Sequence, residues 1–170
     1  MKNQYVMLLF FLLWGLTASA VGPQLSYHGR IVDSTTNLGV TGAVDFIIQV
    51  RTPTTAADNC ILYEETQTKI LNNGTFVLGI NNGAGVRTDT SGYSVEQIFS
   101  NKNTFGSFSL LGGACNSGNP FLYTPSATDV RRVTIKFHDS TMALGAYEPL
   151  PAQTVAYVPS AIDSLAVGGF

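Results

Sequence analysis

An Asn-Asn-Gly turn between two strand-like segments constrains the fold of this chain more than any other feature. Asn72-Asn73-Gly74 separates the segments 60–71 and 75–80. Asn and Gly tolerate the positive φ angles that tight turns between strands require. The second segment is apolar at every other residue from Phe76 to Ile80, which is the pattern of a strand with one buried face. The sequence therefore predicts a β-hairpin around this turn.

Period-two alternation of apolar and polar residues recurs along the chain. It is clearest at 44–51, where Val, Phe, Ile and Val alternate with a mostly polar face. It also predicts a strand at 130–138 and a first strand at 25–31 that Gly29 interrupts. A last strand is expected around Val155 and Tyr157, before Pro159, and a further strand of undetermined register at 105–111.

One short helix is expected among these strands. Ser94 followed three residues later by Gln97 fits a capping box, which predicts a helix from about Val95 to Asn101. Strands joined by turn-rich loops, with a single helix, indicate an all-β fold. We expect an antiparallel β-sandwich of about six or seven strands.

The N-terminus has the three parts of a secretory signal peptide. Lys2 precedes an apolar run of about 12 residues, too short for the roughly 20 residues of a membrane span. Ala18-Ser19-Ala20 fits the small-residue site of signal peptidase, with an uncleaved anchor as the alternative. We therefore expect a signal peptide at 1–20, a β-sandwich domain at 21–158 and a short apolar C-terminal segment at 159–170.

Cleavage before Val21 would place the mature chain outside the cytoplasm: in the periplasm, on the outer surface or in the medium. Removal of Lys2 from a chain of net charge −2 leaves −3, and the charges are scattered. Nucleic-acid binding would need a basic stripe, so no nucleic-acid partner is expected. After the signal peptide no apolar stretch is long enough to span a membrane.

Two cysteines remain in the mature chain, Cys60 and Cys115. In an exported protein an even count indicates a disulfide, which would contribute roughly 4 kcal/mol on the chain-entropy model. Two free or metal-binding thiols are the alternative, but no Cys-x-x-Cys motif or neighbouring His supports a metal site. We expect the disulfide and no metal or other cofactor.

Residues that could carry chemistry have simpler structural interpretations. The two histidines, His28 and His138, fall on the expected outward faces of strands. Asp89-Thr90-Ser91-Gly92 resembles an aspartic-protease turn, but such enzymes need a second copy and none exists, which favours a polar loop. Glu64 and Glu65 are adjacent and must face opposite sides of a strand. The sequence predicts that the protein is not an enzyme.

Aromatic residues in or near loops are the candidate ligand contacts, since they could stack on sugars or on a partner protein. The alternative is that they pack over the ends of the sandwich. These residues are Tyr63, Tyr93, Phe121, Tyr123 and Tyr147.

Several segments together resemble the N-terminal β domain of large bacterial surface fibre proteins of the mosaic adhesive trimer type, which are similar in plan to phage tail fibres. The segments are Leu25-Ser26-Tyr27-His28-Gly29-Arg30-Ile31, Cys60-Ile61-Leu62-Tyr63-Glu64-Glu65, Gly74-Thr75-Phe76-Val77-Leu78, Tyr123-Thr124-Pro125, Val155-Ala156-Tyr157-Val158-Pro159-Ser160-Ala161 and Val167-Gly168-Gly169-Phe170. In such proteins the last two lead into a trimeric shaft and a recognition tip, and this sequence contains neither. The resemblance implies a base module that tethers or assembles.

Two functions remain open. The first is a non-enzymatic, exported structural or interaction module of the bacterial envelope or surface, of fibre-base or adhesin type. It would associate, as a homotrimer, through the C-terminal segment, whose short apolar helix-like pattern offers Ile162, Leu165 and Phe170. The same segment could instead fold back on its own domain. The alternative function is a stand-alone carbohydrate-binding, lectin-like domain, so an envelope protein or a glycan is the expected partner.

Overall fold

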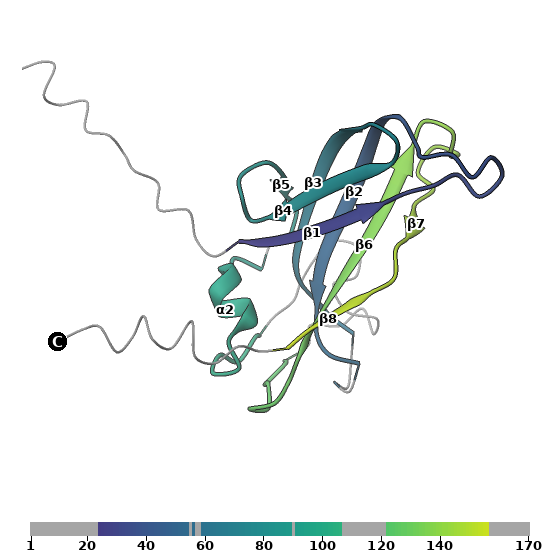
Figure 1. The fold of residues 1–170 in the computed structure, drawn as a ribbon. Helices are drawn as coiled ribbons and strands as arrows, with labels where there is room; N and C mark the ends of the chain where they lie inside the picture. The colour runs from purple at the N-terminus through teal and green to yellow at the C-terminus, as the bar shows by residue number, and fades with distance from the viewer. Residues whose placement is uncertain (1–23, 55, 57–58, 90, 107–121, 157–170) are drawn as a thin grey trace, which may run out of the picture.

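Two antiparallel sheets lie face to face in the computed structural model (Figure 1). The structure describes residues 24–54, 56, 59–89, 91–106 and 122–156. The predicted signal peptide 1–20 and segment 159–170 lie outside these residues and stay predictions. Within them the fold is all-β with one short helix, which confirms the expected class.

The larger sheet is built on three long strands: β2 (Gly42–Arg51), β3 (Ile61–Leu71) and β6 (Arg131–Asp139). Short strands extend both of its edges, so that the order is β5-β3-β2-β6-β7, with β8 also on β6. These short strands are β5 (Val86–Arg87), β7 (Glu148–Pro149) and β8 (Gln153–Val155). In β2 the predicted apolar face, Val44, Phe46, Ile48 and Val50, is buried.

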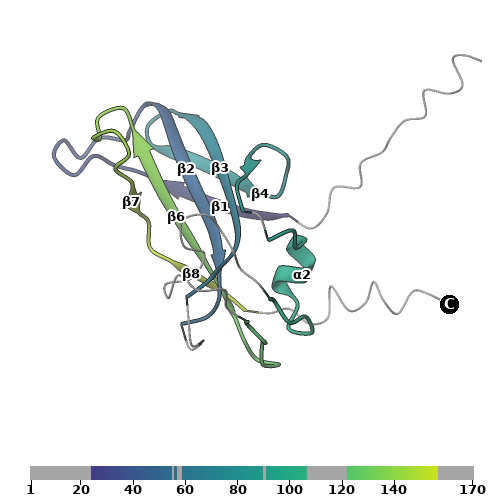
Figure 2. The same ribbon diagram turned by 180° about the vertical axis from the view of Figure 1, so that it is seen from behind.

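The smaller sheet contains β1 (Leu25–Arg30) and β4 (Thr75–Ile80), which cross one face of the larger sheet (Figures 1 and 2). Phe76 packs between the layers, with its ring centroid 4.8 Å from that of Phe46 and 6.0 Å from that of Tyr27. Contrary to the prediction, Gly29 does not interrupt β1. It leaves room for the Phe76 ring, because a Cβ at Gly29 would overlap that ring.

The hairpin prediction was wrong in its pairing and right in its turn. Asn73 and Gly74 have φ angles of 55° and 77°, as such a turn requires. However, β3 pairs with β2 while β4 pairs with β1, so the turn leads from one sheet to the other. The turn is held by backbone hydrogen bonds to the segment between β1 and β2. Gly74 N–H donates to Val40 O at 2.7 Å, and Ile31 N–H donates to Gly74 O at 2.9 Å. It is a corner of the sandwich.

The helix α2 (Val95–Phe99) begins at the predicted capping box, where Ser94 and Gln97 bond reciprocally. It is two residues shorter than expected, because Ser100 is already extended. The last strand, β8, precedes the expected centre and ends at Val155, and Tyr157 lies outside the described residues. Of the uncertain strand at 105–111, Phe105 forms a single bridge with Tyr123.

Candidate functional site: an open groove between the two sheets

One side of the sandwich is open. A groove of about 340 Å³ lies between β1 of the small sheet and β8 of the large sheet. Val133 of β6 and Ile80 of β4 contribute apolar surface to it, and the exposed polar side chains of Ser26 and Thr154 flank it. Its lining residues are Leu25, Ser26, Tyr27, His28, Ile80, Val133, Gln153, Thr154 and Val155.

Two strand edges flank the groove. Within the described residues β1 pairs with β4 alone, and β8 pairs with β6 alone. An unpaired edge presents backbone N–H and C=O groups that can bond another extended chain. The first described strand, β1, and the last, β8, are the two strands on either side of the groove (Figures 1 and 2). The groove therefore combines apolar surface, strand edges and the first and last described strands of the chain.

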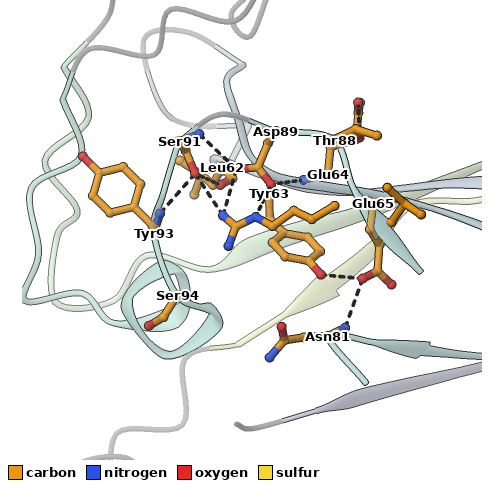
Figure 3. A network of polar contacts seen from close by, with 12 residues as sticks. Leu62, Tyr63, Glu64, Glu65, Asn81, Thr88, Asp89, Ser91, Tyr93 and Ser94 are labelled. Atoms are coloured by element: carbon orange, nitrogen blue, oxygen red, sulfur yellow. Dashed lines mark hydrogen bonds and ion pairs between the residues drawn. The ribbon is translucent and has the colours of Figure 1, made fainter. Parts of the chain in front are cut away.

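On the β3 side of the sandwich, a buried polar cluster forms around Glu65, which is 3% exposed. Its carboxylate accepts hydrogen bonds from the Tyr63 hydroxyl and from the Asn81 N–H at 3.2 Å (Figure 3). It also accepts one from Gln67 Nε2 at 2.5 Å. Gln67 Nε2 also donates to Gly79 O at 2.9 Å. Because β3 and β4 lie in different sheets, these side-chain bonds join the layers where a backbone ladder is missing. As expected, Glu64 faces the other side of β3 and bonds Gln49 and Thr88.

Asp89 fastens the loop after β5 onto β3 (Figure 3). Its carboxylate accepts hydrogen bonds from Arg87 Nε at 2.6 Å, Ser91 Oγ at 2.6 Å and the Glu64 N–H at 3.0 Å. Burial by itself raises the pKa of the Asp89 carboxyl, but these bonds together outweigh it and hold that pKa below its usual value. The polar-loop interpretation of this motif agrees with these contacts, which give Asp89 a structural role.

Arg131 is the largest fully buried side chain among the described residues, although in the sequence it stands out only as half of a basic pair. Its guanidinium donates to Ile98 O at 2.6 Å, Ser100 O at 3.1 Å and the Tyr123 hydroxyl at 3.1 Å. It thus satisfies carbonyls at the C-terminal end of α2. Burial lowers the pKa of Arg131 from its usual value. The sequence did indicate that Arg131 is buried, because in a strand residue 131 lies on the same face as the inward-facing Val133.

The candidate ligand-contact aromatics do not come together at one place. Tyr63 and Tyr123 are buried, at 1% and 4% exposure, and Arg87 covers the Tyr63 ring at 4.8 Å from its centroid. The Tyr93 hydroxyl bonds the backbone of Gly106. Tyr147 is 38% exposed, and its ring centroid lies 5.5 Å from that of His138. Among the four described, Tyr147 is the one that is exposed to solvent, and Phe121 lies outside the described residues.

The two histidines are separated in the fold. His28 is exposed on β1 and lines the groove, in agreement with its predicted outward face. His138 is half-buried on β6, where Nδ1 lies 2.7 Å from Ala146 O. In the part of the chain that the structure describes, no group of three or more His, Cys, Asp or Glu side chains is arranged to hold a metal ion. No helix among the same residues is long and apolar enough to cross a membrane.

Of the two predicted disulfide cysteines, the structure describes Cys60. It is fully buried just before β3, and its N–H donates to Thr52 Oγ1 at 2.9 Å. Cys115 lies outside the described residues, so the disulfide stays a prediction. Ile162, Leu165 and Phe170 also lie outside them. Sequence reasoning missed the groove, because β8 was expected two residues later and β1 was expected to break at Gly29.

Comparison with known proteins gives no match: no protein-family model, no curated protein and no solved structure is significantly similar to this chain.

Proposed function

We propose that this chain is an exported, non-enzymatic interaction module of the bacterial envelope or surface, which assembles with copies of itself as the base of a fibre or adhesin. The open groove between β1 and β8 carries the proposal. It places two strand edges that are unpaired among the described residues beside Val155, from which the sequence leads on to the apolar segment 159–170. Exposed edges and apolar segments of this kind are natural interaction elements.

The engagement of the polar residues supports a structural role. Asp89 and Glu65 are the carboxylates that the sequence analysis considered as catalytic candidates. Each accepts three or more hydrogen bonds, which hold a loop in the case of Asp89 and join the sheets in the case of Glu65. Arg131 is likewise committed to backbone carbonyls. Export is supported by the sequence of 1–20, with its apolar run and Ala18-Ser19-Ala20.

Sedimentation of the mature chain tests the proposal. At tens of micromolar we expect an oligomer, with a trimer as the predicted state. Deletion of residues 160–170 should yield a monomer that still melts cooperatively by circular dichroism. A mature chain that is monomeric at these concentrations, with a deletion that only lowers its melting temperature, would contradict self-association.

A carbohydrate-binding domain is the second candidate, and the exposed ring of Tyr147 beside His138 favours it. Titration of the mature chain with a panel of soluble glycans should then give saturable binding that Tyr147→Ala abolishes. Tyr93→Phe is the matched control, because the Tyr93 hydroxyl is engaged with Gly106. Absence of saturable binding across the panel would remove this candidate.

A further inference from the structure

The groove has the chemistry of a site for an extended peptide. Leu25, Tyr27 and Val155 are partly buried and pack against the core, so they offer apolar surface on both flanks. The edges of β1 and β8 offer backbone hydrogen bonds on the same two flanks. A peptide that adds to a strand edge gains affinity from such bonds and specificity from alternate side chains that enter pockets.

The length of the groove limits the occupant to a few residues. Four consecutive residues of β1, Leu25 to His28, line it. At about 3.3 Å per residue a strand of about four residues covers that length. The matching occupant has apolar side chains at alternate positions and small or polar side chains between them.

A run in the apolar C-terminal segment meets this requirement. The wider segment has a helix-like pattern, but the four residues Ser164-Leu165-Ala166-Val167 also fit a short strand, because the larger apolar residues Leu165 and Val167 alternate with two small ones. We infer that residues 164–167 from a second copy of this chain occupy the groove between β1 and β8. This inference rests on the proposed function and names the surface that self-association uses.

The route of the chain favours a second copy over the same chain. β8 ends at Val155, in the flank of the groove, and Pro159 follows four residues later. The residue before a proline is biased toward extended conformations, so the sequence Val158-Pro159 favours a chain that continues onward from the end of β8. Residues 164–167 of the same chain would need a full reversal to return, whereas those of a neighbour need none.

Such a contact joins two different surfaces, a groove on one copy and a tail on the next. It is therefore heterologous, and repeated copies either close into a ring or continue as a filament. A ring of three copies would satisfy every groove and every tail, in agreement with the predicted trimer.

Paired variants of the full mature chain test the inference. Ser26→Glu combined with Thr154→Glu places two charges in the groove at positions that are exposed in the free domain. Leu165→Asp disables the tail. Each variant should assemble at least tenfold more weakly than wild type by sedimentation, because occupation would bury an unpaired charge. Val77→Glu is the matched control, since Val77 is exposed on the other strand of the small sheet and does not line this groove.

Mixing the two defective proteins gives the decisive result. The groove variant keeps an intact tail and the tail variant keeps an intact groove, so together they should form a one-to-one complex that neither forms alone. No complex in the mixture would overturn the inference. A groove variant that assembles like wild type would also overturn it while leaving self-association standing. A wild-type chain that is monomeric would instead defeat the proposed function.

A photo-crosslinking amino acid at position 26 provides a readout that does not depend on the stability of the variants. Mixed isotopically labelled and unlabelled chains should give crosslinks from position 26 to residues 164–167 of the other isotopic form. Crosslinks confined to one isotopic form would show that the tail folds back on its own domain, which overturns the inference.

Discussion

Gly29 lies directly beneath the ring of Phe76, so closely that a Cβ at residue 29 would stand 2.8 Å from Phe76 Cε1. The ring reaches across the layers to Phe46. Gly29→Ala should therefore lower the free energy of unfolding by about 1–3 kcal/mol through overpacking. Chemical denaturation measures this loss.

A double-mutant cycle isolates the contact. In a Phe76→Leu background the ring is gone, so Gly29→Ala should cost clearly less than it does in wild type. Equal costs in both backgrounds would show that the Phe76 ring is not what excludes a side chain at Gly29.

Glu65 joins the two sheets, so Glu65→Gln should destabilise the fold while keeping the side-chain shape. The amide loses the charge and places an NH₂ group opposite existing donors, at an expected cost of about 1–3 kcal/mol. Glu148→Gln, at an exposed position on β7, is the control and should be nearly neutral. Thermal melts of the two variants should separate; coincident melts would refute the joining role.

Asp89 should make stability depend on acid pH. Its folded pKa lies below the unfolded value of about 3.9, so its contribution is present above that value and is lost as pH falls through the folded pKa. The free energy of unfolding should decline below about pH 4, and Asp89→Asn should flatten that decline. Denaturation curves on both sides of that pH measure the two slopes, and parallel slopes would count against this account.

Arg131 holds the C-terminal end of α2, so Arg131→Lys should loosen that region. Lysine cannot reproduce the bonds to Ile98 O, Ser100 O and the Tyr123 hydroxyl together, and a loss of about 2–3 kcal/mol is expected. Hydrogen exchange should rise at residues 95–106 before it rises in β2. Arg132→Lys, on the outward face of the same strand, should change stability by less than about 1 kcal/mol.

Cys60 and Cys115 should be joined in the exported protein. Thiol titration of the denatured, unreduced mature chain should find no free thiol, and reduction should lower the free energy of unfolding by about 4 kcal/mol. Two titratable thiols per chain would refute the bond.

Local patterns were enough to predict most of the strands. Alternation located β2, β4 and β6, and the capping box at Ser94 located the start of α2. Pairing was not local, because Asn73 and Gly74 adopt the same positive φ angles in a corner as in a hairpin. β4 pairs instead with β1, which is far from it in the sequence, and in this pairing Phe76 packs over Gly29.

The candidate site was harder to predict for the same reason. The groove is made mainly by β1 and β8, which come from distant parts of the sequence, and their free edges can be identified only once the strand pairing is known. Short strands such as β5, β7 and β8 have too few residues to establish a period.

The topology of the sheets also has a kinetic consequence. Leu25 pairs with Ile80, and Val44 pairs with Asp139, so both layers depend on contacts between distant parts of the chain. Folds dominated by such contacts form slowly, since loop closure must precede the stabilising pairs. β2 acquires its second neighbour only when β6 is available, near the end of the described chain. If the chain is exported as proposed, and so crosses a membrane before it folds, this late completion would help to keep the polypeptide unfolded during transit.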